Sequence, residues 1–148
     1  MSDLRMILIA EDNPHDAELT LAAISSHRVA NEVVLVRDGS EVMDFLHARG
    51  AWASRRPGLP SVILLDLKMP KVDGLEVLRQ VRNDPRLATI PVVMLTSSAE
   101  DRDIAESYRL GANAYVVKPV AFEEFMHAVG HLGQFWALLN EPPPAEAA

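Results

Sequence analysis

Five short runs of aliphatic residues recur along the chain, and none of them alternates apolar with polar positions. They are Met6–Ala10, Val33–Val36, Val62–Leu65, Val92–Leu95 and Ala114–Val117. A strand with one solvated face shows such alternation, whereas a strand buried on both faces is apolar throughout. The runs therefore predict a parallel sheet with helices covering both of its faces.

Between the aliphatic runs, apolar residues recur at helical spacing. Residues 75–81 supply one apolar face after the third run, and Ile104 and Tyr108 are expected to share a buried face after the fourth. A longer apolar stripe runs over residues 122–139 after the fifth. Alternating strands and helices in a chain of this length predict an open, doubly wound α/β sheet, with right-handed crossovers.

The 148 residues are enough for one domain. We expect it to span residues 1–139, including a long C-terminal helix. Residues 140–148 contain three consecutive prolines and are expected to form a flexible tail. The link over residues 49–60 is unusually long, and a surface excursion is the simplest interpretation of it.

Composition excludes several classes of protein. The net charge of −7 argues against binding to nucleic acid or to an anionic membrane surface. The absence of cysteine excludes a disulfide scaffold, a thiolate metal site and a cysteine nucleophile. Neither a signal peptide nor an apolar run long enough for a transmembrane helix is present in the sequence, so a cytoplasmic location is expected.

Chemically active side chains follow four of the aliphatic runs. Glu11 and Asp12 follow the first run, Asp66 the third, Thr96 the fourth and Lys118 the fifth. The carboxyl ends of parallel strands share one edge of the sheet, which is where ligands bind in this architecture. Crowded carboxylates suit Mg²⁺, and a neighbouring lysine suggests that an anion such as a phosphoryl group joins the metal.

These residues lie in motifs that resemble the receiver domain of two-component response regulators. The resemblance covers about residues 5–130, in family order and spacing. It implies a flavodoxin-like (βα)5 fold with a five-stranded parallel sheet in the order 2-1-3-4-5. The motifs are Ile9–Asn13, Leu64–Pro70, Asp73-Gly74, Val93–Ser97 and Tyr115–Pro119.

The resemblance implies a role for each residue around the metal and the phosphoryl group. Asp66 would be the phosphoacceptor for a sensor histidine kinase. Asp12, Asp66 and the backbone carbonyl of Lys68 would bind Mg²⁺ directly, and Glu11 would act through metal-bound water. Lys118 would pair first with Asp66 and later with a phosphoryl oxygen.

Further roles implied by the resemblance concern the response to phosphorylation. Thr96 would bond a phosphoryl oxygen, and Tyr115 would change rotamer as Thr96 moves. Lys68 and Ser98 occupy positions that tune the phosphoryl lifetime in this family, although both could be ordinary loop residues. The bond between Lys118 and Pro119 would be cis, as is typical of receiver domains.

The sequence thus predicts a response regulator, rather than an enzyme, that accepts a phosphoryl group on Asp66 and switches its protein contacts. It could also pass the group to a downstream phosphotransfer protein. The alternative is an interaction module that works without phosphorylation, but the complete set of site residues favours the first interpretation. A phosphatase with an aspartate nucleophile would need an acid where Lys68 stands. Only about nine residues follow the last apolar stripe, too few for a DNA-binding domain, so a stand-alone receiver is expected.

The Phe135-Trp136 ending, the long link and the segment with Asp84-Pro85 and Ile90-Pro91 are similar to a subgroup of single-domain receivers. Members of this subgroup partner with phytochrome-type histidine kinases. Phe135 and Trp136 extend the stripe beyond the usual family end, and aromatic residues are enriched at interface cores. We therefore expect a homodimer through Phe135 and Trp136, the alternative being that they pack within the chain, against the Trp52 link.

The expected dimer can be tested by light scattering. The double variant Phe135→Ala/Trp136→Ala should have the mass of a monomer where the wild type has twice that mass, because the aromatic anchors of the interface are lost. An equal mass for both proteins would contradict the prediction.

Overall fold

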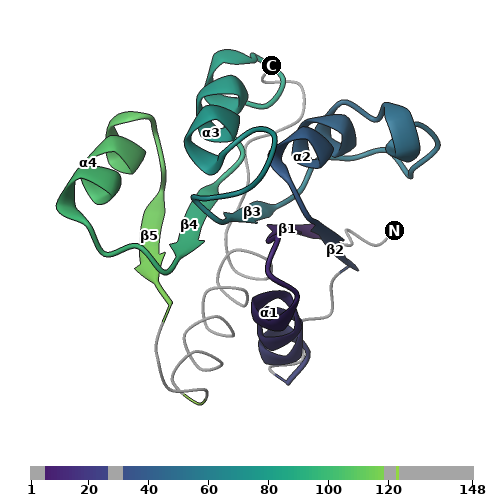
Figure 1. The fold of residues 1–148 in the computed structure, drawn as a ribbon. Helices are drawn as coiled ribbons and strands as arrows, with labels where there is room; N and C mark the ends of the chain where they lie inside the picture. Colours follow the sequence, from purple (N-terminus) through teal and green to yellow (C-terminus); the bar gives the residue numbers. More distant parts are fainter. Residues whose placement is uncertain (1–5, 27–31, 119–122, 124–148) are drawn as a thin grey trace.

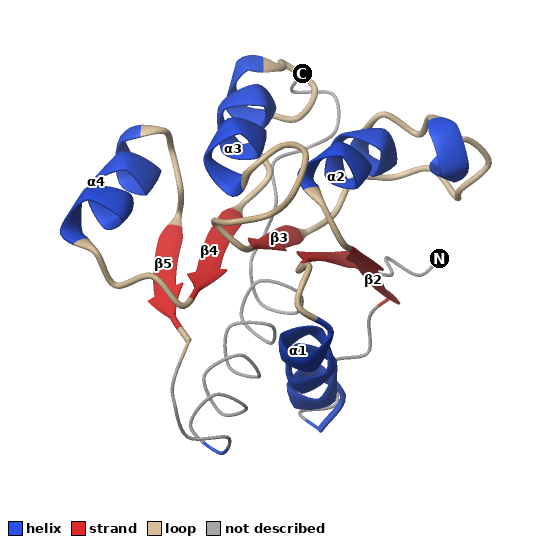
Figure 2. Ribbon diagram, viewed as in Figure 1, coloured by secondary structure: helices blue, strands red, loops and turns tan. Residues whose placement is uncertain are grey.

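The computed structural model describes residues 6–26, 32–118 and 123, and it contains one parallel sheet with helices on both faces (Figures 1 and 2). In chain order the elements are β1 Met6–Ala10, α1 Pro14–Ser26, β2 Glu32–Val36, α2 Gly39–Leu46, the 3-10 helix η1 Gly50–Trp52, β3 Val62–Leu65, α3 Gly74–Asn83, β4 Val92–Thr96, α4 Asp101–Arg109 and β5 Ala114–Val117. The strand order is β2-β1-β3-β4-β5, as predicted.

Each predicted aliphatic run forms a strand. The runs at β1, β3 and β5 agree with the strands at both ends, while β2 begins one residue earlier and β4 ends one residue later than predicted. All neighbouring strands pair in parallel. The carboxyl ends of β1, β3, β4 and β5 therefore lie along one edge, which positions the residues that follow them.

Burial on both faces explains why the strands do not alternate. Leu8 and Ala10 of β1 belong to the core on the side of α2 and α3, whereas Ile7 and Ile9 belong to the core on the side of α1. Figure 1 shows α1 on one face of the sheet and α2 with α3 on the other. Successive residues of a strand point to opposite faces, so a sheet covered on both sides needs apolar residues at every position.

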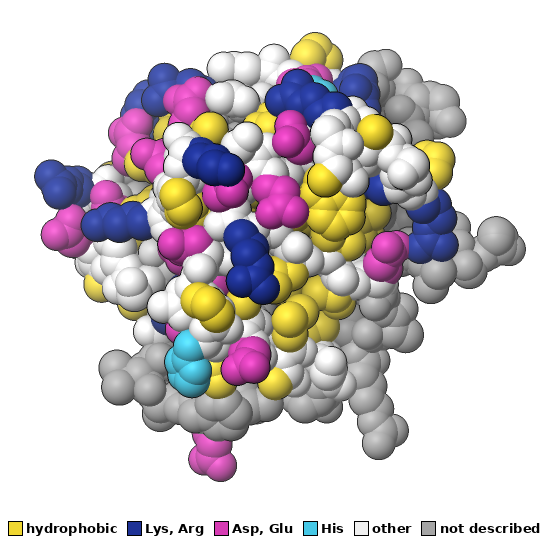
Figure 3. Space-filling model, turned by 45° about the vertical axis from the view of Figure 1, so that its right-hand side comes forward, with side chains coloured by type: hydrophobic (Ala, Val, Ile, Leu, Met, Phe, Trp, Pro, Cys, Tyr) yellow, Lys and Arg dark blue, Asp and Glu magenta, His cyan; other side chains and the backbone are white. Residues whose placement is uncertain are grey.

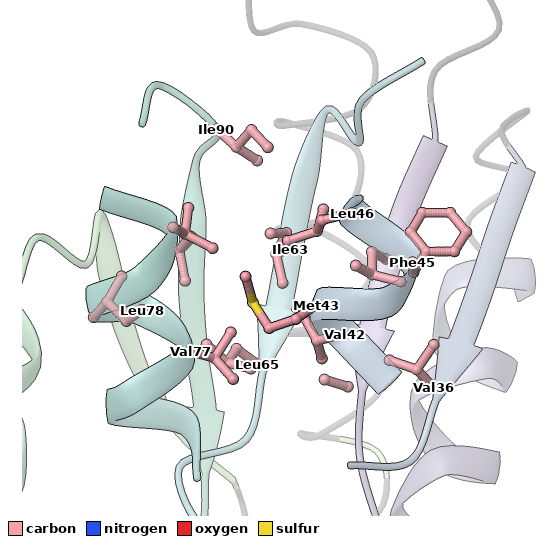
Figure 4. Packing of buried hydrophobic residues seen from close by; sticks show 14 of the residues in the cluster. Val36, Val42, Met43, Phe45, Leu46, Ile63, Leu65, Val77, Leu78 and Ile90 are labelled. Atoms are coloured by element: carbon pink, nitrogen blue, oxygen red, sulfur yellow. The ribbon is translucent and has the colours of Figure 1, made fainter. Parts of the chain in front are cut away.

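The core under α2 and α3 is built mainly from aliphatic side chains. Figure 4 shows Val42, Met43 and Leu46 of α2 packing toward Ile63 of β3, with Val77 of α3 alongside. All five side chains are at most 5% exposed. Burying an aliphatic side chain of this size contributes about 1.5–3 kcal/mol, so this layer is a major support of the sheet.

Short polar side chains begin three of the helices. The Asn13 carboxamide oxygen accepts from the backbone N–H of His15 at 2.9 Å, and Pro14 opens α1 as expected. Asp38 and Asp73 cap α2 and α3 in the same way. Such caps satisfy N–H groups that the helix itself leaves free, so each helix starts directly beside the edge of the sheet that carries the site.

The prediction that Ile104 and Tyr108 share a buried face of α4 is wrong. Tyr108 is 50% exposed, and the fully buried residue of this helix is Ser107, whose hydroxyl donates to the Asp103 carbonyl at 2.8 Å. Adjacent helix positions lie about 100° apart, so an error of one position moves a side chain from the core to solvent. Ile104 is half-buried, as a residue beside the true face should be.

The long link between α2 and β3 packs onto α2 rather than extending freely. The ring of Trp52 meets the ring of Phe45 edge-on at a centroid distance of 4.9 Å, and its indole N–H donates to Glu41 at 3.2 Å. The guanidinium of Arg55 lies over the ring of Phe45, 4.2 Å from its centre. Aromatic and cation–π contacts thus hold this segment on the helix.

Several expectations lie outside the described residues. They concern the long C-terminal helix apart from Glu123, the tail over residues 140–148, the aromatic pair Phe135 and Trp136, and the cis bond at Pro119. Within the described part of the chain, every helix is too short or too polar to span a membrane.

Acidic and basic side chains are interspersed on the face of the molecule shown in Figure 3.

The guanidinium of Arg82 ties α3 to the segments before β4 and β5. It donates to the carbonyls of Ala88 at 3.1 Å and Ile90 at 2.8 Å. It also donates to the Gly111 carbonyl at 2.9 Å and to the Asn113 side chain at 2.8 Å. Gly111 has φ +106°, and a Cβ there would lie 2.9 Å from Arg82 Nε, so glycine is required on both grounds.

Arg82→Ala should lower the free energy of unfolding by about 2–3 kcal/mol, because four charge-assisted acceptors lose their donor. Arg79→Ala is the matched control on the same helix, since Arg79 is exposed and pairs only with Glu76 among the salt bridges of the described residues. This control should change stability by no more than about 0.5 kcal/mol. Urea unfolding measures both, and equal losses would contradict the assignment.

Candidate functional site

A cleft of ≈ 720 Å³ lies at the carboxyl edge of the sheet. It is lined by the residues that the sequence predicted to gather there: Glu11, Asp12, Asp66, Lys68, Thr96, Ser98 and Lys118. These residues come from four different strand ends, so the strand order alone is enough to bring them together.

Asp66 is held in a fixed position directly after β3. Its backbone N–H donates to the Ala10 carbonyl at 3.1 Å, which continues the pairing with β1. Gly74 N–H donates to the Leu67 carbonyl at 2.7 Å, and a Cβ on Gly74 would lie 2.2 Å from the Asp66 carbonyl oxygen. Only glycine at position 74 lets α3 begin this close, which fixes the backbone that carries the Asp66 carboxylate.

The ammonium group of Lys118 contacts three carboxylates. Its Nζ lies 2.7 Å from Glu11 Oε1, 2.8 Å from Asp16 Oδ2 and 3.3 Å from Asp66 Oδ2. The Lys118 backbone N–H donates to the Thr96 carbonyl at 2.8 Å, which aims the side chain into the cleft. The lysine side chain is only 8% exposed, so solvent screens its contacts with Glu11 and Asp66 little.

Asp16 was not predicted from the sequence. It lies in the first turn of α1, and that helix starts at the carboxyl edge of β1. A side chain in this turn is placed over the same edge as the residues that end the strands. The acidic first turn of the helix was the available signal, but first-turn acids are common because they favour the helix dipole.

Burial and charge shift the pKa values of two groups in the cleft. Desolvation raises the pKa of Glu11 to about 7, with a further rise from the Asp66 charge, against the opposing effect of Lys118. Desolvation acts to lower the pKa of Lys118, but the hydrogen bonds to Asp16 and Glu11 outweigh it and the pKa is raised. Lys118 is therefore a permanent cation among acids that repel one another.

The acids have the composition of a site for a hard divalent cation. Ligand oxygens of Glu11, Asp12 and Asp66 lie within 4.8 Å of one another. With Asp16 and Glu100 they make five acidic side chains along the cleft, against the two lysines Lys68 and Lys118. An all-oxygen donor set with excess negative charge fits Mg²⁺, so the residues present are suited to the predicted metal.

Thr96 and Ser98 connect the cleft to β5. Thr96 is 2% exposed, and its hydroxyl oxygen accepts a long bond of 3.4 Å from the Ser98 N–H. The hydroxyl of Tyr115 donates to the Ser98 carbonyl at 2.9 Å, and the Ser98 hydroxyl donates to Asp103 at 2.6 Å. A shift of the segment after β4 would therefore be transmitted through these hydrogen bonds to both α4 and β5.

The fold and this cleft are those of an α/β domain whose acidic pocket lies at the carboxyl ends of the strands. The chain belongs to the response regulator receiver domain family, whose profile matches residues 7–130. Receiver domains of this family partner with histidine kinases in two-component signalling.

Individual response regulators are similar to this chain over most of its length. The response regulator Rcp1 from Synechocystis sp. is 37% identical over 133 residues, which are 89% of this chain and 88% of Rcp1. The bacteriophytochrome response regulator AtBRR is 57% identical with a TM-score of 0.77, over 95% of this chain and 100% of AtBRR. The phosphorylated cyanobacterial phytochrome response regulator RcpA is 38% identical with a TM-score of 0.87, over 95% and 99% of the two chains.

A solved structure of Rcp1 holds Mn²⁺ and matches this chain with a TM-score of 0.86, at 34% identity over 95% of this chain and 99% of Rcp1. The chain is thus similar in fold to a relative that binds a divalent cation.

Asp12→Asn should weaken Mg²⁺ binding at least roughly tenfold, because it removes a charged ligand from the cluster. Asp12 is exposed, so the core is not disturbed. Glu100→Gln is the matched control, since Glu100 lines the same cleft but is not among the clustered acids. Isothermal titration with MgCl₂ measures both variants, and equal affinities would count against the cluster as the metal site.

Proposed function

We propose that this receiver domain accepts a phosphoryl group on Asp66 from a histidine kinase and thereby changes its contacts with other proteins. The observation that carries the proposal is the convergence of the three-acid cluster, which includes Asp66, and the Lys118 ammonium in one cleft. Mg²⁺ would be held by Glu11, Asp12 and Asp66, with the Lys68 carbonyl as a further ligand.

The transfer reaction replaces a phosphorus–nitrogen bond by a phosphorus–oxygen bond. A carboxylate oxygen of Asp66 attacks phosphorus, and the donor imidazole leaves with the bonding electrons and takes up a proton. The product on this chain is an acyl phosphate. Such a transfer depends mostly on alignment and on charge neutralisation, to which bound Mg²⁺ contributes by offsetting the gathered negative charge.

Two side chains of the cleft would stabilise the phosphorylated state. Lys118 already lies 3.3 Å from Asp66, so its ammonium can donate to a phosphoryl oxygen at the same place. Thr96 is buried beside the cleft with a hydroxyl proton that can be donated to another phosphoryl oxygen. Hydrogen bonds to a charged phosphoryl group are stronger than those between neutral groups.

The same contacts supply a route for the switch. Movement of Thr96 toward the phosphoryl group would pull the segment through Ser98, whose carbonyl accepts from Tyr115. Tyr115 would then change its position on β5, and the surface formed by α4 and β5 would change with it. Lys68 and Ser98 both line the cleft, where they would tune the access of water to the phosphoryl group.

We further propose that the partner kinase is of the phytochrome type. The support is similarity: AtBRR, at 57% identity, and the 38% identical RcpA are both phytochrome response regulators by name.

Incubation with acetyl phosphate and Mg²⁺ tests the site. Intact-mass spectrometry should show one added phosphoryl group on the wild type. It should show none on Asp66→Asn, which lacks the nucleophile, and none on the wild type in excess chelator, which removes the metal. Asp44→Asn is the control, since Asp44 lies on α2 and pairs with Arg49. Equal labelling of Asp66→Asn and wild type would contradict the proposal.

The kinase assignment needs a separate measurement. A phosphorylated phytochrome-type histidine kinase should transfer its label to the wild type at least roughly tenfold faster than an unrelated histidine kinase does, as expected when partner surfaces are matched. Equal transfer from both kinases would contradict the phytochrome link and leave the role of Asp66 untouched.

A further inference from the structure

Asp16 makes a contact in the cleft that the function above does not use. Its Oδ2 lies 2.8 Å from Nζ of Lys118, a shorter distance than the 3.3 Å between Nζ and Asp66. The contact joins the first turn of α1 to the end of β5 across 102 positions of sequence. Lys118 is thus held more closely by Glu11 and Asp16 than by the phosphoacceptor.

Asp16 also differs from the other two acids that contact Lys118. Glu11 and Asp66 belong to the cluster whose oxygens lie within 4.8 Å of one another, and Asp16 does not. A divalent cation on that cluster would neutralise Glu11 and Asp66 and weaken their attraction for the ammonium. Asp16 would then be the one contacting acid whose charge the cation leaves uncompensated.

We propose that Asp16 is a positioning residue that holds the Lys118 ammonium back from Asp66 and so opposes formation of the phosphorylated state. The inference rests on the proposed function. A phosphoryl oxygen on Asp66 and the carboxylate of Asp16 compete for the same ammonium, which lies nearer to Asp16, at 2.8 Å, than to Asp66, at 3.3 Å. Asp16 thereby sets how readily the site is phosphorylated and how firmly Lys118 holds the product.

The burial of the two partners fixes the expected size of the effect. The Lys118 side chain is 8% exposed and that of Asp16 is 29% exposed, so the pair is partly screened by solvent. Partly exposed ion pairs couple modestly, and we expect roughly a fivefold change in the affinity for a phosphoryl group when the Asp16 charge is removed. The direction is a gain of affinity, since a competitor for Lys118 is lost.

Beryllium fluoride with Mg²⁺ is a suitable probe, because it mimics the phosphoryl group without a covalent step. Isothermal titration should show Asp16→Asn and Asp16→Ala binding the probe roughly fivefold tighter than wild type. Asp16→Glu, which keeps the charge, should return toward the wild-type affinity. Glu100→Gln is the matched control for loss of a negative charge from the cleft, and it should change the affinity less than twofold, since Glu100 pairs with Arg102.

A second readout needs no metal or probe. In the metal-free protein, the Nζ protons of Lys118 should exchange with water several-fold faster in Asp16→Ala than in wild type, and at the wild-type rate in Glu100→Gln. Nitrogen-detected NMR of the labelled ammonium measures this. Equal exchange in wild type and Asp16→Ala would overturn the proposed contact, and thermal unfolding of each variant verifies that the fold is kept.

The outcomes separate the two proposals. Unchanged or weaker probe binding in both Asp16→Asn and Asp16→Ala, or a gain equal to that of Glu100→Gln, overturns the role of Asp16. Asp66→Asn is a further variant in the same titration, because loss of beryllium fluoride binding in it supports Asp66 as the phosphoacceptor. If Asp66→Asn binds the probe as well as wild type does, the proposed function itself fails.

Discussion

The site depends on the attraction between one buried ammonium and the carboxylates around it. Lys118 is permanently charged and lies within 3.3 Å of Glu11, Asp16 and Asp66, which would otherwise repel one another in a poorly solvated cleft. Because five acidic side chains line the cleft and its two lysines, Lys68 and Lys118, offset only part of their charge, the cleft favours a cation. The proposed chemistry follows from this imbalance, since a divalent metal and a phosphoryl group can enter together with little net change in charge.

The fold could be predicted from the sequence because a parallel sheet buried on both faces has an unambiguous pattern. Each of the five aliphatic runs became a strand, and the strand order followed from the resemblance to receiver domains. The convergence of Asp66, Thr96 and Lys118 was predictable for the same reason, as parallel strands end at one edge. The helices were less certain: the spacing of Ile104 and Tyr108 suggested a buried face, but Ser107 is the residue that α4 buries.

Contacts between distant segments could not be predicted. Asp16 has the sequence appearance of an ordinary first-turn acid, and only the start of α1 beside β1 brings it to Lys118. The sequence pattern likewise predicts Arg82 as a surface residue of an amphipathic helix, but its guanidinium donates to the Gly111 carbonyl, 29 positions away. Both depend on how elements pack together, and local periodicity carries no information about that packing.

Locating the phosphoryl group on the chain tests the central claim most directly. An aspartyl phosphate is an acyl phosphate, so borohydride reduces it to homoserine, which is then found by sequencing the digested protein in a mass spectrometer. After reaction with acetyl phosphate and Mg²⁺, the account predicts homoserine at position 66 and at no other position. Homoserine at position 12, or a phosphoryl group that survives reduction on a histidine or serine, would contradict it.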